Sequence, residues 1–523
     1  MIKFLQTVRY FKLKQVYYQC YYRLKAVLKI GNYNSARDLN EPFQSIIWED
    51  FVLSENSLLS TNTFEFLNIR HSFSEKFDWN LNDYGKLWTY NLNYFDYLNQ
   101  EEISLNDGLF LIQKFIAEND SLKDGKEPYP ISLRGINWIK FLSKHSIVDY
   151  DINKALFGHY QILFHNLEYH LLGNHLLENG FSLFFGAYFF KDEVLYKKAI
   201  KILKEELNEQ ILKDGAHFEL SPMYHQIVLY RLMECINLSH HNKWKEDGIE
   251  LFLRQKASKM LSWLEETTFS NGNIPMVNDS AYGIAPTSRQ IFDYAEKLKL
   301  NWTKGQLTDS GYRKFFRSKY EFFLDVGNVG PDYQPGHAHS DTFNFEMYVS
   351  GRPVIVDTGI STYEKNRLRR QERGTVSHNT VQVGNQDQTQ VWGGFRVAKR
   401  ARIVSLEEGP DYVKATHNGY SNLGIEHTRS FTFEPSRVII NDELNKNTMQ
   451  KQSAFFHFHP SVKKIDLNQN LVELCNENIT IKFDGAIGIE IGKYNFCKGF
   501  NLREKSLKII VSFQRNLNAQ IEV

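Results

Sequence analysis

The chain has 523 residues, of which 42% are hydrophobic and 24% charged, and its formal net charge is +1. This length exceeds one ordinary hydrophobic core, so at least two domains are expected. The near-zero net charge gives no electrostatic reason to expect nucleic acid as a partner. The absence of any run of 18 apolar residues excludes a conventional transmembrane helix.

The cysteine pattern argues against a zinc site built from thiolates. Cys20, Cys235, Cys475 and Cys497 are widely separated and form no CxxC pair. We therefore expect reduced, structural thiols.

The N-terminal segment is basic. The first 37 residues contain eight Lys or Arg and no Asp or Glu. They lack the apolar region and small-residue cleavage site of a secretory signal. The compartment stays open: periplasmic or secreted if the protein is exported, cytoplasmic otherwise. We assign residues 1–80 to a basic helical segment and lead-in, packed on the protein, with an amphipathic helix on an anionic surface as the alternative.

Residues 100 to 300 carry apolar side chains at helical spacing. The pattern is clearest over 109–112, 136–142, 155–172, 181–190, 199–207, 226–238 and 251–264. Many helices joined by short loops predict hairpins packed around a shared axis. We place this helical domain at residues 81–312.

From about residue 320 the pattern changes to short strands separated by Gly, Asn and Asp. These segments are 320–326, 343–348, 353–356, 380–383, 402–404, 431–433, 438–440 and 507–513. A run of strands after a run of helices predicts a separate domain, here 313–523, with an antiparallel β-sandwich as the expected fold.

Two places in the helical half are candidates for a cleft. Asn174 and His175 stand where one long helical pattern ends and another begins; helix capping by Asn174 is the structural alternative. Ser221 and Pro222 predict a helix start with Tyr224 in its first turn. The positive end of the helix dipole would then stabilise a phenolate. A core tyrosine is the alternative.

The strand-rich half contains a set of metal-type ligands. His339, Asp357 and His378 are 18 and 21 residues apart, with predicted strands between them, and His337 precedes them. Imidazole and carboxylate suit a divalent cation such as zinc or manganese. His337 would remain free for acid–base work. Ordinary buried or surface histidines are the alternative.

These residues suit β-elimination from a uronic acid polysaccharide. The proton at C5 becomes acidic only when the neighbouring carboxylate is neutralised, which Asn174 with His175 could do. A base must then remove the proton, and an acid must protonate the leaving O4. Tyr224 and His337 are suited to these two roles.

Across residues 85 to 400 the chain resembles the heparinase II/III family of polysaccharide lyases. The matching segments are 87–95 (LWTYNLNYF), 133–138 (LRGINW), 174–175, 214–225, 336–341 (GHAHSD), 357–359, 377–380 and 391–396 (VWGGFR). The resemblance implies an N-terminal (α/α) toroid followed by a C-terminal antiparallel β-sandwich. It also implies an acidic polysaccharide as the substrate.

Position by position, the resemblance assigns carboxylate neutralisation to Asn174, shared with His175. It makes Tyr224 the general acid and a candidate base, and makes His337 the residue that abstracts or relays a proton. His339, Asp357 and His378 match a structural site for one divalent metal ion. The residues implied for the saccharide groove are Trp88, Tyr90, Asn91, Asn93, Arg134, Asn137 and Trp138, with Glu219 orienting its neighbours.

Two other functions remain as alternatives. A glycoside hydrolase on the same toroid would need two carboxylates at catalytic separation. A non-catalytic or assembly-associated polysaccharide-binding protein of a surface-polysaccharide pathway would need neither Tyr224 nor His337. The sequence leaves open the uronate, the sulfation pattern, endo or exo attack, the metal's identity and the oligomeric state.

Overall fold

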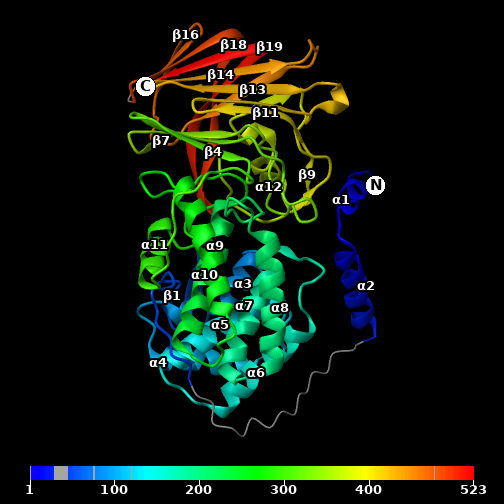
Figure 1. Ribbon diagram of the computed structural model, residues 1–523, viewed down its shortest axis with the longest axis vertical. Helices are drawn as coiled ribbons and strands as arrows, with labels where there is room; N and C mark the ends of the chain where they lie inside the picture. Colours follow the sequence, from blue (N-terminus) through cyan, green and yellow to red (C-terminus); the bar gives the residue numbers. More distant parts are fainter. Residues whose placement is uncertain (1, 29–44, 75–76, 119–120, 476) are drawn as a thin grey trace.

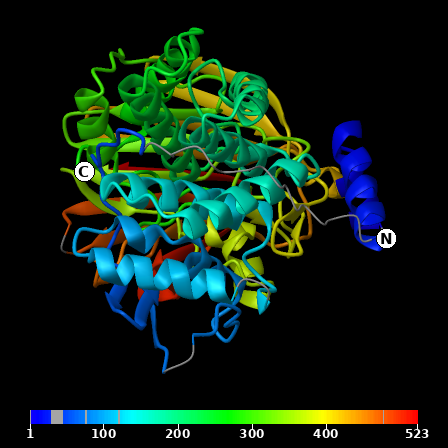
Figure 2. The ribbon, with the colours of Figure 1, turned by 90° about the horizontal axis from the view of Figure 1, so that it is seen from below.

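The computed structural model describes residues 2–28, 45–74, 77–118, 121–475 and 477–523. Most helices occupy one end of the long axis, and the two large sheets occupy the other (Figure 1). Two N-terminal helices, α1 (Ile2–Val8) and α2 (Leu13–Val27), lie at the edge of the molecule in both views (Figures 1 and 2). The predicted fold class, a helical toroid followed by an antiparallel sandwich, is confirmed.

The lead-in contains a small antiparallel sheet that the sequence did not predict. Its strands are β1 (Leu58–Ser60), β2 (Thr63–Phe66) and β3 (Ile69–Ser72). Phe64 and Phe66 of β2 lie on the helical domain, each with a ring centroid 5.2 Å from an aromatic ring there. Strands this short contain too few residues to display a clear alternating pattern.

The helical domain is built from consecutive helices that pack on one another, α5 on α6, α7 on α8 and α9 on α10. Its helices are α3 (Lys86–Tyr94), α4 (Leu105–Ala117), α5 (Pro128–Lys144), α6 (Tyr150–His165), α7 (Gly173–Phe190), α8 (Glu193–Gln210), α9 (Pro222–His241), α10 (Ile249–Thr267) and α11 (Ser288–Lys297). Almost every side chain of α7 is buried. This central helix therefore fixes where its first residues, Asn174 and His175, emerge.

One predicted helix extended too far. The apolar pattern over 155–172 ends as a helix at His165, and residues 166–172 form a loop. Leu167, Tyr169 and Leu172 are buried in that loop. Their apolar spacing reflects packing in irregular structure and not helical periodicity.

The sandwich has two antiparallel sheets. The smaller contains β4 (Tyr312–Phe316), β5 (Tyr320–Asp325), β6 (Phe345–Val349) and β7 (Arg352–Ile355). The larger follows the order β11 (Ile403–Gly409), β12 (Tyr412–His417), β13 (His427–Phe433), β14 (Arg437–Leu444), β19 (Leu502–Glu522), β18 (Ile479–Gly499), β17 (Leu471–Leu474) and β16 (Ile465–Asn468). β15 (Gln452–His457) joins β19 to β8 (Val381–Val383). A small hairpin, β9 (Val391–Trp392) with β10 (Arg396–Val397), stands apart.

Aromatic rings fill the space between the sheets. Phe322 of β5 lies 5.7 Å from Phe431 of β13, and Phe345 of β6 lies 5.9 Å from Phe456 of β15, between ring centroids. Interdigitating side chains of this kind form the core of a β-sandwich. The smaller sheet also continues directly into the loop that carries His337 and His339.

A buried arginine ties this loop to the next site-bearing segment. Arg429 is fully buried and donates both to the carboxylate of Asp442, at 2.6 and 2.9 Å, and to the carbonyl oxygens of Phe343 and Asn379, at 3.0 and 2.8 Å. Charge pairing offsets the cost of burying the guanidinium. Arg429 thereby holds the segment that follows His339 next to the segment that follows His378.

The turn that leads into α9 depends on a glycine. Gly215 has φ +95°, and a Cβ there would lie 2.1 Å from the carbonyl oxygen of Lys259. Gly272 has φ +88° with open space around it. Replacement by Ala strains the backbone at both positions by about 1–2 kcal/mol. Only at Gly215 does a collision add to the strain.

We predict that Gly215→Ala lowers the free energy of unfolding by about 1–3 kcal/mol more than Gly272→Ala does, because only the former forces α10 away from the turn. Urea denaturation of the two variants measures the difference. Equal losses would show that the turn accommodates the extra methyl group.

Candidate active site

Three sequence-predicted residues meet where the toroid faces the sandwich. Asn174 begins α7, Tyr224 begins α9, and His337 lies in the loop between β5 and β6. The rings of Tyr224 and His337 stack with centroids 3.8 Å apart. Nδ2 of Asn174 lies 3.3 Å from Nε2 of His337. The tertiary structure thus joins both domains in one cluster.

The first turn of α9 places Tyr224 as the sequence predicted. The hydroxyl of Ser221 accepts the backbone N–H of Tyr224, and Pro222 occupies the first helical position. A serine cap and a proline at this position both favour a helix start.

The start of α7 requires a sharper turn. Leu172 and Gly173 both have positive φ, at +63° and +59°. A Cβ on Gly173 would lie 2.6 Å from Oε1 of Glu219. Glycine therefore allows the backbone of α7 to approach Glu219 closely.

Glu219 lies behind Asn174 and orients it. Its carboxylate accepts the backbone N–H and the side-chain Nδ2–H of Asn174, at 3.2 and 2.7 Å. It also lies 3.5 Å from Nε2 of His337. Because Glu219 is only 2% exposed, it positions its neighbours, as the sequence analysis expected, and offers no surface to a substrate.

Asp279, which the sequence analysis did not single out, connects most of the site. Its carboxylate accepts Nδ1–H of His337 at 2.9 Å, Nε2–H of His339 at 2.8 Å, and two N–H groups of Arg369 at 2.5 and 2.6 Å. Burial would raise the pKa of Asp279, but Arg369 and the histidines hold it well below its usual range. A histidine that donates from Nδ1 keeps a lone pair on Nε2. In His337 this lone pair faces Asn174.

The expected phenolate at Tyr224 is wrong. Burial raises the pKa of Tyr224 well above its ordinary value; a hydrogen bond with Tyr363 opposes the shift, and the charge of Asp279 adds to it. Desolvation of the ring and the nearby charges of Asp279 and Glu219 both favour the protonated form. Tyr224 is consequently a neutral hydroxyl at ordinary pH, which suits an acid.

His175 lies in the opposite electrostatic setting. Its Nδ1 lies 3.0 Å from Oε1 of Glu168. Burial lowers the pKa of His175, but the paired carboxylate outweighs burial and the net pKa is raised. The ring packs 4.8 Å from that of Tyr129, and 37% of the side chain remains exposed. The ring of His175 is therefore partly accessible beside Asn174, in a setting that favours its protonated form.

The three predicted metal ligands are neighbours in the sandwich. Nδ1 of His378 lies 2.7 Å from Oδ2 of Asp357, and the rings of His339 and His378 are 5.3 Å apart. Within the described residues, Nδ1 of His339, Nε2 of His378 and Oδ2 of Asp341 are buried without a hydrogen-bond partner. Burial lowers the pKa of His339 to about 3, which keeps it in the neutral form that binds metals.

The donor chemistry fits a divalent cation, whereas the present arrangement is incomplete. In the part of the chain that the structure describes, no three His, Cys, Asp or Glu side chains are arranged to hold a metal ion. Burial also raises the pKa of Asp341 to about 6 and that of Glu346 to about 8. A bound cation would offset the cost of ionising these buried carboxyl groups.

Most residues expected in the saccharide groove are structural instead. Trp88, Asn93, Arg134, Asn137 and Trp138 are each at most 2% exposed. Arg134, for example, donates to the carbonyl oxygens of Asn93 and Gly125, and burial lowers its pKa to about 9. They cannot contact a polysaccharide because the toroid core encloses them.

Two members of that set remain partly accessible. Tyr90 donates to Oε1 of Glu127 at 2.9 Å, and Asn91 donates to the carbonyl oxygen of Leu87 at 2.8 Å. Both lie on α3 and are only partly buried.

Two aromatic residues that were not predicted, Tyr363 and Phe395, lie beside Tyr224 and His337. The hydroxyl of Tyr363 lies 3.2 Å from that of Tyr224, and its ring lies 5.1 Å from that of Phe395. Phe395 is 41% exposed and lies 6.2 Å from the ring of His337. The motif containing Phe395 was noticed, but nothing in the sequence placed it, Tyr363 or Asp279 beside Tyr224.

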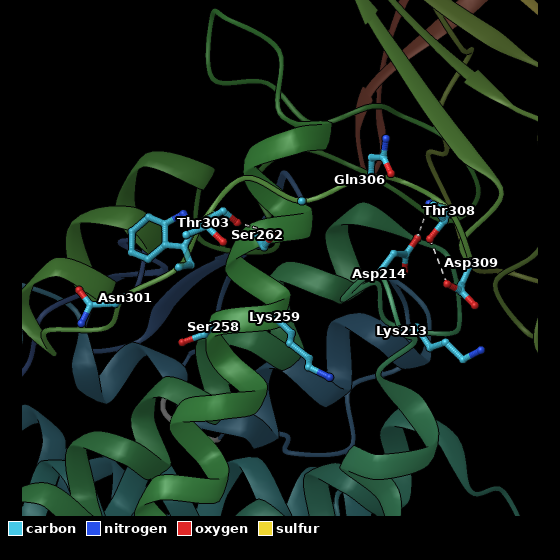
Figure 3. A pocket seen from close by; sticks show the side chains of 12 residues that line it. Lys213, Asp214, Ser258, Lys259, Ser262, Asn301, Thr303, Gln306, Thr308 and Asp309 are labelled. Carbon is cyan, nitrogen blue, oxygen red and sulfur yellow. Dashed lines mark hydrogen bonds between the residues drawn. The ribbon is translucent and has the colours of Figure 1, made fainter. Parts of the chain in front are cut away.

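A well-formed cavity lies apart from this cluster. It has a volume of about 550 Å³ and is lined by residues of 213–214, 258–262 and 301–309 (Figure 3). There Asp214 accepts the backbone N–H groups of Thr308 and Ser310, so the cavity marks the joint between α11 and β4. None of the predicted catalytic residues lines it.

Comparison with known proteins identifies the relatives of this chain. Residues 131–307 match the model for the heparinase II/III N-terminus, and residues 301–523 match that for the heparinase II/III-like C-terminal domain. The chain belongs to the heparinase II/III family. Both halves of the site thus lie within family-specific regions.

Named relatives are distant. The chain is 26% identical to a heparin-sulfate lyase of Pedobacter heparinus over 53% of this chain and 44% of that protein. It is also 26% identical to a heparin-sulfate lyase of Bacteroides stercoris, over 61% of this chain and 50% of that protein. The chain thus spans about half the length of these curated relatives.

Solved structures support the fold. A crystal structure of heparinase III superposes with a TM-score of 0.68 at 16% identity, covering 98% of this chain and 91% of the other. Heparan sulfate lyase HepC from Pedobacter heparinus gives 0.55 at 18% identity, covering 96% and 87%.

Asp279→Asn tests how far the family site depends on this one carboxylate. Because it leaves the buried charge of Arg369 without a counter-ion, we predict a loss of about 3–5 kcal/mol in stability, measured by urea denaturation. Asp309→Asn, at an exposed position, serves as the control. A loss no larger than in the control would show that Arg369 has another adequate partner.

Proposed function

We propose that this protein is a polysaccharide lyase that cleaves uronic-acid-containing polysaccharides by β-elimination. The observation that carries the proposal is the geometry of His337. Its Nδ1 is occupied by Asp279, while Nε2 retains a lone pair beside Asn174 and against the ring of Tyr224. A base, an acid and a carboxylate-binding amide thus lie together at one side of the domain junction.

In the proposed reaction, Nε2 of His337 removes the proton at C5 of the uronate. The electron pair of that C–H bond forms the C4–C5 double bond, and the C4–O4 bond breaks. The neutral hydroxyl of Tyr224 gives its proton to the leaving O4. The hydroxyl is protonated at ordinary pH and therefore has a proton to give, which the negative charge developing on O4 would accept.

Asn174 and His175 would neutralise the substrate carboxylate. The amide Nδ2 of Asn174 is a hydrogen-bond donor held by Glu219, and the raised pKa of His175 favours its cationic form. Donors fixed in advance stabilise developing negative charge without reorganisation. Tyr363 and Phe395 add aromatic surface on which a sugar ring can pack.

The relatives' names support glycosaminoglycans as the substrate class. Three matched relatives are called heparin-sulfate lyases. Hyaluronan, chondroitin sulfate and heparan sulfate are therefore the first candidates, with alginate as a further uronate polymer.

The site argues against hydrolysis. Its nearest carboxylates, Glu219 and Asp279, are at most 2% exposed and are occupied by Asn174, two histidines and Arg369. A glycoside hydrolase needs two carboxyl groups that reach the scissile bond. A protein that only binds polysaccharide would need no paired acid and base.

We expect ultraviolet absorbance of a 4,5-unsaturated product when the protein is mixed with its substrate from a panel of hyaluronan, chondroitin and dermatan sulfates, heparin, heparan sulfate and alginate. Tyr224→Phe and His337→Gln should each lower the rate by about 100- to 10,000-fold, because each removes a proton-transfer group. Tyr150→Phe and His240→Gln, which change exposed residues outside the site, should leave it unchanged.

If new reducing ends appeared without ultraviolet absorbance, the protein would be a hydrolase and the lyase proposal would be wrong. Saturable binding with neither signal would favour the binding or assembly role.

We propose further that His339, Asp357 and His378 hold one structural divalent metal ion, zinc or manganese. Support comes from the free ring nitrogens of the two histidines and from the carboxylate–histidine contact between Asp279 and His339, an arrangement that orients metal-binding imidazoles. Such an ion would supply positive charge among the buried carboxyl groups of the sandwich.

Elemental analysis of purified protein should find about one equivalent of zinc or manganese, and His339→Ala should lose it. A chelator should lower the thermal midpoint of the wild-type protein but not that of the variant. Metal-free protein with an unchanged midpoint would contradict the proposal.

A further inference from the structure

The helix α2 faces the protein with its polar side. Gln15, 3% exposed, donates to the carbonyl oxygens of Leu171 and Tyr333, at 3.2 and 3.4 Å. Lys25 donates to the carbonyl oxygen of His165 and to Oδ1 of Asn166, both at 2.9 Å. On a surface helix of a globular protein, the apolar side normally faces the core. In α2 this arrangement is reversed.

The apolar side of α2 faces outward. Leu13 is 88% exposed, Tyr17 64%, Leu24 58% and Val27 78%. With Val16, Tyr21 and Leu28, which are also exposed, these side chains fall within about 140° of the helix circumference at 3.6 residues per turn. We call these seven residues the outer stripe. The stripe continues into α1, where Ile2, Phe4 and Leu5 are 73%, 53% and 57% exposed.

The two helices are firmly attached despite this exposure. The hydroxyl of Thr7 on α1 donates to the carbonyl oxygen of Val397 at 3.0 Å and accepts Nε1–H of Trp392 at 3.2 Å. The ring of Tyr18 on α2 stacks 4.7 Å from that of Tyr169. α1 is thus fixed to the sandwich and α2 to the toroid. These contacts hold α2, which carries the outer stripe, at the edge of the molecule, where its ribbon lies in Figure 2.

Basic residues border the outer stripe. Residues 2–28 contain six Lys or Arg and no Asp or Glu, although the whole chain has a net charge of only +1. By helical spacing, Arg23 lies along one border. Lys14 and Lys25 lie along the other border, where both also contact the protein: Lys14 is 3.9 Å from the carboxylate of Glu205, and Lys25 makes the hydrogen bonds described above. Apolar and tyrosine side chains flanked by basic residues are typical of helices that lie in the interface of an anionic bilayer.

We propose that α1 and α2 dock this protein onto a lipid bilayer that contains anionic lipid, with the outer stripe in the interface. A second copy of the chain fits less well, because pairing two outer stripes would bring their basic borders together. Across the described residues, no helix is long and apolar enough to cross a membrane. In this proposal α1 and α2 lie on the bilayer surface.

Flotation of the full chain with vesicles tests the proposal. It should bind vesicles of phosphatidylcholine mixed with phosphatidylglycerol more tightly than vesicles of phosphatidylcholine alone, and added salt should weaken the binding. Leu13→Gln with Leu24→Gln should weaken binding about a hundredfold, since each leucine loses its burial in the interface. Arg23→Gln should weaken binding to the anionic vesicles about fivefold.

Val194→Gln with Leu251→Gln is the matched control, because these residues are 61% and 62% exposed on α8 and α10; its binding should equal that of the wild type. Failure to bind anionic vesicles would overturn the proposal, as would equal binding by the Leu13/Leu24 variant. Analytical sedimentation without lipid measures the oligomeric state of the wild type and of the Leu13/Leu24 variant. A dimer lost in that variant would overturn the proposal in favour of self-association.

Discussion

The carboxylate of Asp279 is the interaction on which the site depends. It receives hydrogen bonds from His337, His339 and Arg369 in a place with no exposure to water. Arg369 keeps it ionised, and the ionised carboxylate in turn selects which ring nitrogen of each histidine carries a proton. One buried charge pair therefore orients both His337, which faces Asn174, and His339, which lies on the sandwich side. Asp279 itself comes from the end of the toroid, so the pair also joins the domains.

Around this centre the protein creates contrasting settings for similar groups. Tyr224 is desolvated among acidic neighbours, which keeps its hydroxyl protonated. His175, the residue after Asn174, is paired with Glu168, which raises the pKa of the imidazole. For the proposed elimination, this would separate a protonated acid from a group that favours positive charge beside the substrate carboxylate.

The loop 166–172 contacts both the candidate active site and the N-terminal helix α2. Glu168 within it binds His175, while the carbonyl oxygen of Leu171 accepts Gln15 of α2. The proposed bilayer-facing helix therefore rests on the segment that leads into α7, which carries Asn174 and His175. A polysaccharide lyase held in this way would work on chains close to a membrane.

The sequence by itself determined the order of the two domains, most helices and strands, and the helix start at Tyr224, because apolar periodicity and capping are local properties. It also singled out Asn174, His175, Tyr224 and His337 as candidates, and the structure brings Asn174, Tyr224 and His337 into contact. Only the tertiary structure showed that Arg134, Asn137 and Trp138 are enclosed in the toroid, since burial depends on what packs against a helix. It alone revealed Asp279 and Tyr363, which are far from their partners in sequence. The raised pKa of Tyr224 likewise depends on the tertiary structure, because burial of its ring and the nearby charge of Asp279 come from packing that the local sequence does not show.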